Sequence, residues 1–105
     1  MNDLEINLAI AKIERVVIEH ITNTDNAIMV YSEDVEQEYK LYNPLTDDAL
    51  IFPLAFKHKV KIDYFDECVY ITSPRKVTRN RFDKDDIESL RKAILLAIIE
   101  ANKES

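Results

Sequence analysis

The chain contains 105 residues and no glycine, although average usage of about 7% would supply roughly seven. Glycine adopts positive φ without steric cost and allows the backbone to approach a phosphate closely. Its absence excludes the Walker A, dinucleotide-binding and kinase-type glycine loops. Asn and Asp best replace glycine in turns. We therefore expect turns at Asn23-Thr24-Asp25-Asn26 and at Asp66-Glu67, with Asp66 supplying the positive φ of a two-residue hairpin turn.

Catalytic and metal-binding motifs are also missing. The single cysteine, Cys68, excludes an internal disulfide framework and a multi-cysteine zinc site. The two histidines lie in no nucleophile-and-base motif; we expect His20 to close the first helix and His58 to lie at the surface. Neighbouring acidic residues point apart on helices and strands, so they form no catalytic pair by themselves. The sequence predicts a protein that is not an enzyme, with no cofactor and no metal.

Size and hydropathy predict one domain, residues 1–105, without a membrane segment. The longest apolar run, residues 93–99, spans about 10 Å as a helix, against roughly 30 Å for a bilayer core. The first residues include Asp3 and Glu5 and lack the basic start of a signal peptide. We therefore expect a cytoplasmic protein in which Cys68 is reduced.

Charge is distributed unevenly along the chain, whose net charge is −6. Residues 1–48 hold 3 basic and 11 acidic residues, a net charge of −8, and residues 49–105 hold 11 basic and 9 acidic residues, a net charge of +2. Because an acidic protein repels polyphosphate at long range, the sequence disfavours general DNA binding.

Three helices are expected. The first covers about 3–20, with apolar residues at helical spacing and a capping box formed by Asn2 and Glu5. A second, short helix begins at Asp47 behind Thr46 as N-cap and is interrupted at Pro53. Asp83 caps the last helix. Its run 93–99 is apolar all round, which predicts either the most buried helix of the domain or a homodimer through that face.

Two hairpins are expected between these helices, from residues 27–31 with 35–42 and from residues 60–65 with 68–72. Residues 75–81 read as a basic loop, and no internal sequence repeat is evident. The fold class predicted is α+β: an antiparallel sheet of about four strands packed by the N- and C-terminal helices, with a short proline-containing helix between the two hairpins.

Two charged groups are candidate binding residues. An acidic strip follows the first hairpin, at Glu33, Asp34, Glu36 and Glu38. It either keeps an exposed edge soluble or binds a basic groove of a partner. A basic group comprises Lys61, Arg75, Lys76, Arg79 and Arg81. It is either a solvated face or a contact for a phosphate or an acidic partner.

One segment resembles a known family. Tyr42-Asn43-Pro44-Leu45-Thr46-Asp47, followed by Pro53, is similar to the central motif of small phage and prophage proteins of the NinX-like, phage α-β-α sandwich family. Asp48 stands where that family usually has an aromatic residue, and Phe52 where it often has Gly. The resemblance implies a mobile-element origin, a sheet with helices packed on it, and no known reaction. A turn followed by a helix cap also accounts for these residues.

These observations leave binding as the expected function. We predict a small acidic, non-enzymatic protein-interaction module of phage or mobile-element type. Its partner is a host or phage protein, and inhibition of a host defence or nucleic-acid-handling complex is one version of this role. The alternative is a small-ligand-binding or sequestering protein that uses the basic loop, which predicts a pocket with convergent Lys61, Arg75, Lys76 or Arg79. An enzyme would instead show a cleft that holds a histidine or carboxylate with a perturbed pKa.

Overall fold

The computed structural model describes residues 2–16, 18–21, 28–32, 38–72 and 77–103, and for 18–21, 28–32 and 38–41 it describes the backbone. In chain order the elements are α1 (Asp3–Ile13), β1 (Ile18–Ile21), β2 (Ile28–Ser32), β3 (Glu38–Tyr42), α2 (Asp48–Lys57), β4 (Lys61–Asp63), β5 (Cys68–Thr72), β6 (Val77–Arg81) and α3 (Ile87–Ala101). The predicted α+β class and the two hairpins are confirmed.

The strands form two antiparallel sheets within the described residues, where we expected one sheet of about four strands. Sheet A has the order β1-β2-β3 and sheet B the order β4-β5-β6. Each predicted hairpin gains one strand: β1 lies in the segment expected to be helical, and β6 lies in the expected basic loop. The two hairpins therefore belong to separate sheets with α2 between them in the chain.

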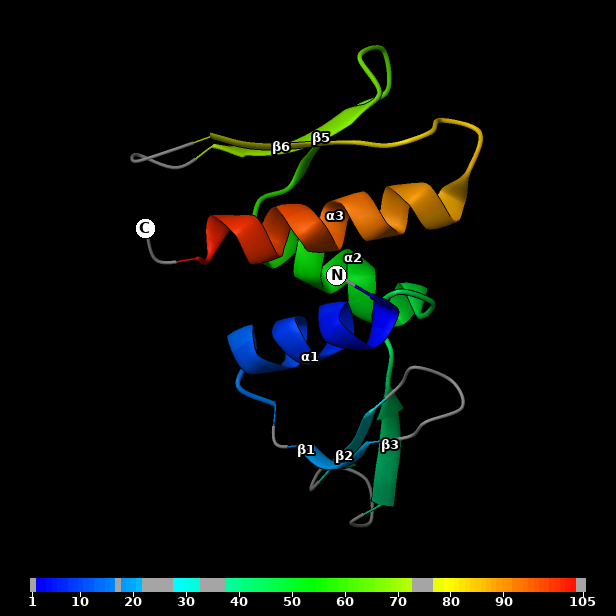
Figure 1. Ribbon diagram of the computed structural model, residues 1–105, viewed down its shortest axis with the longest axis vertical. Helices are drawn as coiled ribbons and strands as arrows, with labels where there is room; N and C mark the ends of the chain where they lie inside the picture. Colours follow the sequence, from blue (N-terminus) through cyan, green and yellow to red (C-terminus); the bar gives the residue numbers. More distant parts are fainter. Residues whose placement is uncertain (1, 17, 22–27, 33–37, 73–76, 104–105) are drawn as a thin grey trace.

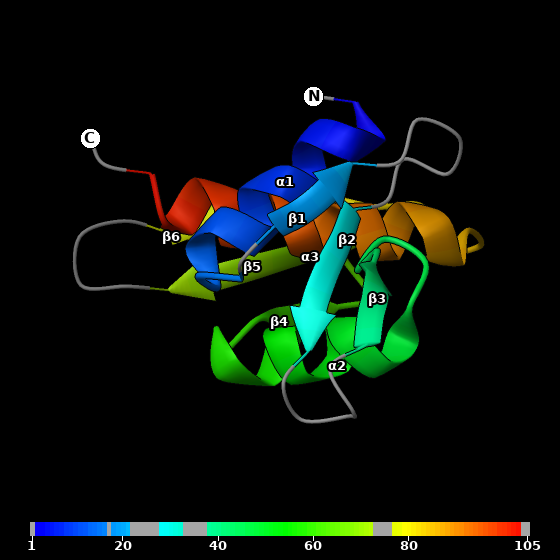
Figure 2. The ribbon, with the colours of Figure 1, turned by 90° about the horizontal axis from the view of Figure 1, so that it is seen from below.

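The helices lie between the two sheets (Figure 1). α3 packs on β5 and β6 of sheet B, α1 packs on α3, and β2 of sheet A lies against α1. The first and last helices thus cover different sheets instead of sharing one. α2 contacts α3 and lies along one side of the molecule (Figure 2).

The first helix ends at Ile13, well before the predicted residue 20. Its capping box is confirmed, because Asn2 accepts from the Glu5 amide at 2.8 Å and Glu5 accepts from the Asn2 amide at 3.2 Å. After the C-cap, Arg15 has φ 56°, and the Val16 amide donates to the Ala11 carbonyl at 2.9 Å. This is a Schellman ending with Arg in the place of Gly. It turns the chain out of the helix, so that Ile18–Ile21 forms β1 and His20 lies in a strand.

α2 ends in the same way. Lys59 has φ 56°, and the Val60 amide donates to the Ala55 carbonyl at 2.9 Å. At its start, Asp47 is the N-cap in place of the predicted Thr46, since its side chain accepts from the Ala49 amide at 3.0 Å. The helix also continues through Pro53, which lies on its solvent-exposed side.

The second hairpin turns over residues 64–67, with Glu67 at φ 53°. Glu67 therefore takes the positive φ that we assigned to Asp66. The Asp63 side chain accepts from the amides of Phe65 at 3.0 Å and Asp66 at 3.1 Å. That contact fixes the turn at four residues instead of two.

α3 forms the centre of the core. Its N-cap is Asp86, whose side chain accepts from the Glu88 amide at 3.0 Å, whereas the predicted cap Asp83 accepts from the Asp85 amide in the preceding turn. The apolar run is buried within the chain, between sheet B on one side and α1 and α2 on the other: Ala93, Ile94, Leu95, Ala97, Ile98 and Ile99. Packing within one chain thus accounts for its all-round apolar character, and a homodimer through this face stays a prediction without support in the structure.

The same local plan occurs twice along the chain, although no repeat is evident in the sequence. A helix, a cationic residue with positive φ, a valine, a three-stranded meander, a buried aromatic residue and an aspartate N-cap follow one another in both halves. The corresponding positions are Arg15 and Lys59, Val16 and Val60, Tyr42 and Phe82, and Asp47 and Asp86.

Candidate functional site

The solvent face of sheet B brings together the predicted basic residues that the structure describes. Residues paired across an antiparallel sheet share a face, and the register pairs Lys61 with Tyr70 and Tyr70 with Arg79. The next row pairs Asp63 with Cys68 and Cys68 with Arg81. We call these six residues, with Thr72 and Val77, the sheet B face. The alternate residues Val69, Ile71 and Thr78 are buried beneath it.

The cations of this face lack ion pairs. Neither Arg79 nor Arg81 forms an ion pair with any residue in the described part of the chain, and the ammonium of Lys61 lies over the Tyr70 ring at 5.7 Å from its centroid. Five cations elsewhere are paired with carboxylates: Lys57, Lys84, Arg91, Lys92 and Lys103. Within the same described residues, Lys12, Arg15 and Lys59 form no ion pair either, but they lie at the ends of α1 and α2 and do not share one face. Arg donors suit carboxylate and phosphate oxygens, so two unpaired guanidinium groups on one strand face are a candidate anion contact.

A shallow cavity of about 260 Å³ lies at one end of the sheet B face. It is lined by Asp66, Cys68, Arg79 and Arg81. Two cations thus converge there, but with a carboxylate among them. The predicted basic residues Arg75 and Lys76 lie outside the described residues.

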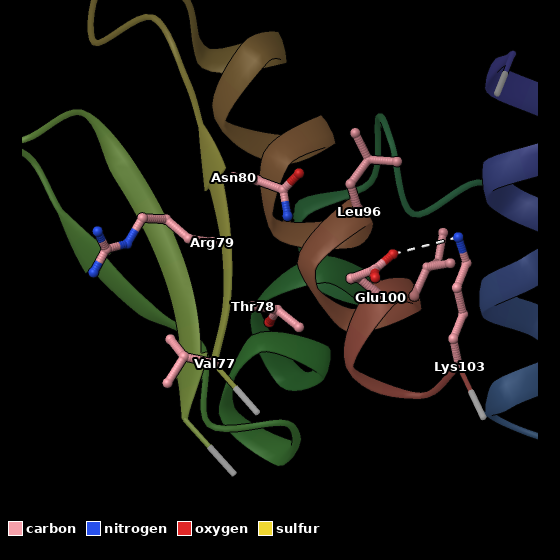
Figure 3. A pocket seen from close by; sticks show the side chains of 8 residues that line it. Val77, Thr78, Arg79, Asn80, Leu96, Glu100 and Lys103 are labelled. Atoms are coloured by element: carbon pink, nitrogen blue, oxygen red, sulfur yellow. Dashed lines mark ion pairs between the residues drawn. The ribbon is translucent and has the colours of Figure 1, made fainter. Parts of the chain in front are cut away.

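A second cavity of about 400 Å³ is lined by residues of β6 and of the C-terminal part of α3. Figure 3 shows Thr78 and Asn80 pointing toward α3, whereas Val77 and Arg79 point away from it. The Thr78 hydroxyl donates to the Ala97 carbonyl at 3.5 Å, and Lys103 and Glu100 pair at the far rim at 3.3 Å. The polar inward residues of β6 explain why its sequence resembles a loop instead of a half-buried strand.

A partly buried polar cluster joins the C-terminal ends of α1 and α2. The Glu14 carboxylate accepts from Lys57 Nζ at 3.0 and 3.1 Å and contacts His58 Nε2 at 3.0 Å. The side chains of Glu14 and His58 are only 13% and 15% exposed, so His58 is not the surface residue we expected. Burial raises the pKa of Glu14, but the hydrogen bonds from Lys57 and His58 outweigh it and leave that pKa below its usual value.

Tyr42 is the fourth titratable group of this region. Burial and the negative charge of Glu14 raise the pKa of Tyr42 from 10.0 to about 12. A carboxylate, a histidine and a tyrosine are thus close together, and titratable groups with shifted pKa values occur both in active sites and in structural ion-pair networks. The cavities at β6 and at the sheet B face are lined by other residues. The contacts of this cluster join the end of α1, at Glu14, to the end of α2, at Lys57 and His58. They stabilise the packing of the two helix ends.

The family-motif residues are occupied by structural contacts. Tyr42 and Pro44 are buried, and the Asn43 carbonyl accepts from the amides of Thr46 at 3.1 Å and Asp47 at 3.0 Å. Asn7, fully buried on α1, donates to the Asn43 side chain at 3.0 Å. The expected turn followed by a helix cap is confirmed, and Asn43 links that turn to α1. Thr46 also borders a third cavity.

Most of the acidic strip lies outside the residues that the structure describes. Glu33, Asp34 and Glu36 lie outside the described residues, and Glu38 begins β3, where its backbone pairs with Ser32. The structure therefore leaves the role of this strip untested.

The sequence reasoning missed an apolar surface on α2. Phe52 is 65% exposed and Phe56 is 88% exposed, and they lie one helical turn apart. Exposed Ala49 lies one turn before Phe52, and exposed Pro53 follows Phe52 in the chain. Ile51 and Leu54 occupy the opposite, buried side. The available signal was that α2 is apolar on both sides, since a helix with one buried face normally carries polar residues on the other.

No metal-binding group of three or more His, Cys, Asp or Glu residues occurs among the residues that the structure describes. In that same part of the chain, no helix is long and apolar enough to cross a membrane. Comparison of the chain with protein-family models, curated proteins and solved structures gives no match.

Proposed function

We propose that the chain is a non-enzymatic protein-interaction module that binds an acidic segment of a partner protein across the sheet B face. The observation that carries this proposal is the row Lys61–Tyr70–Arg79 with Arg81 beside it. A charge left without an ion pair on a folded surface attracts a complementary partner and orients its approach. The chain as a whole carries a net charge of −6 and so repels an acidic partner over most of its surface. An acidic partner is therefore directed to this local basic face.

Two observations favour a protein over a nucleic acid at this face. The overall negative charge repels a polyphosphate at long range. The ammonium of Lys61 also occupies the face of the Tyr70 ring, where a base of a single-stranded nucleic acid would stack. A protein segment with a few carboxylates needs no stacking surface.

Small-ligand binding is the second candidate function, supported by the cavity where Arg79 and Arg81 converge. The carboxylate of Asp66 in the same cavity repels a free phosphate. The cations lie on the two outer strands of sheet B, with Tyr70 between them. This spacing fits a longer partner better than it fits a single small anion.

A mobile-element origin remains part of the proposal. It rests on the resemblance of Tyr42-Asn43-Pro44-Leu45-Thr46-Asp47 to the phage and prophage family. With this origin, the partner is a host or phage protein, and inhibition of a host complex is the role we propose.

Fluorescence anisotropy with defined probes tests the function. The probes are a labelled peptide of alternating Glu and Val, a labelled oligothymidine of equal length, and inorganic phosphate as a competitor. We expect the peptide to bind and salt to weaken that binding. We expect Arg79→Glu with Arg81→Glu to weaken it at least about tenfold, since each charge-assisted hydrogen bond contributes about 1.5–3 kcal/mol.

The matched control is Lys12→Glu with Lys59→Glu, which changes the net charge equally at exposed positions on α1 and after the C-cap of α2. Like Arg79 and Arg81, these two lysines form no ion pair within the described residues. Equal loss of peptide binding in both double variants refutes a defined site. Tighter binding of the oligothymidine refutes the protein partner, and competition by phosphate at low concentration supports the small-ligand alternative.

A further inference from the structure

One edge of β6 has no hydrogen-bonding partner within the described part of the chain. Sheet B has the order β4-β5-β6, so β6 pairs with β5 on one side only. The Phe82 amide, directly after β6, donates to the Glu67 carbonyl at 2.9 Å. Because backbone groups alternate in direction along an antiparallel strand, those of Asn80 and Thr78 also face β5. The amides and carbonyls of the alternate residues face the free edge: Val77, Arg79 and Arg81.

The two arginines of this edge project from the solvent side of the sheet. Figure 3 shows Arg79 pointing away from α3, and Arg81 lies two residues further along the strand, on the same side. A strand added to the free edge would pair with both arginines, and paired residues have Cβ atoms about 5 Å apart on the same face. Carboxylates at two alternate positions of an added strand would therefore reach the guanidinium groups of Arg79 and Arg81.

The cavity of about 400 Å³ lies along the same edge. Its lining residues on β6 come from both faces of the strand, Val77 and Arg79 from one face and Thr78 and Asn80 from the other, and the rest lie on α3 or directly after it. A cavity that touches both faces of β6 lies beside the free edge and not beneath the sheet. The lining residues beyond β6 recur at helical spacing along one flank of α3: Leu96, Ile99, Glu100 and Lys103.

This flank of α3 would lie beneath an added strand. Leu96 and Ile99 form its apolar part, whereas Glu100 and Lys103 pair with each other at 3.3 Å. Side chains alternate between the two faces of a strand, so the residues between the carboxylates would point toward Leu96 and Ile99. Aliphatic side chains at those positions bury apolar area there.

We propose that the acidic segment of the partner binds as an added antiparallel strand along the free edge of β6, with carboxylate and aliphatic side chains in alternation. This inference rests on the proposed function, which it narrows to the β6 side of the sheet B face. In strand addition, main-chain hydrogen bonds supply affinity and alternate side chains supply specificity. A segment held by charge alone would need no particular backbone conformation, whereas an added strand is extended and turns half of its amides toward β6.

Charge distinguishes this occupant and this edge from the alternatives. Pairing β6 with β6 of a second copy would bring arginines close to arginines, and like charges opposite each other destabilise a strand pair. Arg79 and Arg81 therefore oppose self-pairing of the edge and favour an acidic strand. The other edge strand of sheet B is β4, which has three residues and carries Asp63, a carboxylate that repels an acidic segment.

Methylated peptides test the strand addition. The probe is the labelled peptide of alternating Glu and Val. In an antiparallel strand whose carboxylates lie beside Arg79 and Arg81, the Glu amides face β6 and the Val amides face away. One peptide is N-methylated at every Glu amide, and the matched control at every Val amide, so both have the same composition and charge.

Methylation of the Glu amides should weaken binding at least about tenfold, because several hydrogen bonds to β6 are lost together. The peptide methylated at the Val amides should bind like the unmodified one. Loss of binding with both methylated peptides, or with neither, overturns strand addition. Loss only with methylated Val amides overturns the antiparallel direction.

Val77→Pro tests the same edge from the side of the protein. Proline removes the outward amide at the first residue of β6, where a strand tolerates proline, and it leaves the net charge unchanged. We expect peptide binding at least about threefold weaker. The matched control Val77→Ala keeps the amide and should bind like the wild type, and circular dichroism verifies that both variants fold. Equal binding by the two folded variants overturns the proposal.

Failure of this inference is distinguishable from failure of the proposed function. If the unmodified peptide binds and Arg79→Glu with Arg81→Glu weakens it, while the two methylated peptides bind equally, strand addition is wrong and the sheet B face remains a binding site. If the unmodified peptide does not bind, both proposals are overturned.

Discussion

The interior position of α3 can be tested with two substitutions of the same residue type on the same helix. Ile98 is 0% exposed and packs in the core, whereas Ile87 is 57% exposed at the start of the helix. Both become alanine in single variants. Any gain in helix propensity from alanine, a few tenths of a kcal/mol, is similar at the two positions. The difference between the variants therefore reports the burial of Ile98.

The magnitude follows from the atoms removed. Ile98→Ala deletes three buried carbons at about 0.8 kcal/mol each, or about 2.4 kcal/mol. The cavity left behind adds about 1 kcal/mol or more, within the usual range of about 2–5 kcal/mol for such substitutions. Ile87→Ala removes mostly solvated atoms and should cost less than about 1 kcal/mol. A domain of this length has a total stability of about 5–16 kcal/mol, so the first variant loses a large share of it.

Urea unfolding followed by circular dichroism gives both free energies of unfolding, and thermal unfolding gives a second measure. A loss of 3 kcal/mol corresponds to a fall in Tm of about 12–24 °C for a domain of this size. The packing argument is refuted if Ile98→Ala costs less than 1 kcal/mol by this measure, or if Ile87→Ala costs as much as Ile98→Ala.

Three further predictions concern the polar contacts. Glu14→Gln should lower the free energy of unfolding by about 1 kcal/mol at neutral pH, because Lys57 loses its partner. The pKa of Glu14 in the folded state lies below 4.5. The stability that the Glu14 carboxylate contributes is therefore present above pH 4.5 and is lost as the pH falls through the folded pKa. Urea midpoints of the variant and the wild type should converge in acid. The wild type should lose about 3 kcal/mol of stability as the pH rises from 10 to about 12, because the folded state keeps the phenol proton. Tyr42→Phe should remove this loss, and urea midpoints at alkaline pH measure it. Asp47→Ala should cost about 1 kcal/mol as the N-cap of α2, while Thr46→Ala should cost clearly less, which thermal unfolding resolves.

Features set by neighbours in the chain were predictable. The capping box of Asn2 and Glu5 and the turn that begins at Asn43 depend on contacts within a few residues, so their sequence patterns sufficed. The apolar run of α3 likewise predicts a helix buried on more than one side, which is how it packs. Each of these depends on spacing alone, and spacing is visible in a sequence.

Helix ends and turn residues were predicted less well. The chain has no glycine, and among the residues that the structure describes positive φ falls on Arg15, Lys59 and Glu67. None of these residue types favours that conformation. Among residues other than glycine, Asn and Asp tolerate positive φ best. At Arg15 and Lys59, the paired hydrogen bonds of the Schellman ending offset the conformational cost of positive φ. The early end of α1 is therefore a property of the surrounding contacts, and it releases the segment that becomes β1.

By itself, the sequence determined the α+β class, the two hairpins and the absence of the glycine-loop and cysteine-based sites. Only the tertiary structure decided that the strands divide into two sheets and that Lys61 lies across Tyr70 from Arg79. It also decided that α2 presents Phe52 and Phe56 to solvent. The physical reason is that strand pairing and burial depend on residues far apart in the chain, whereas a sequence pattern reports the preferences of neighbours.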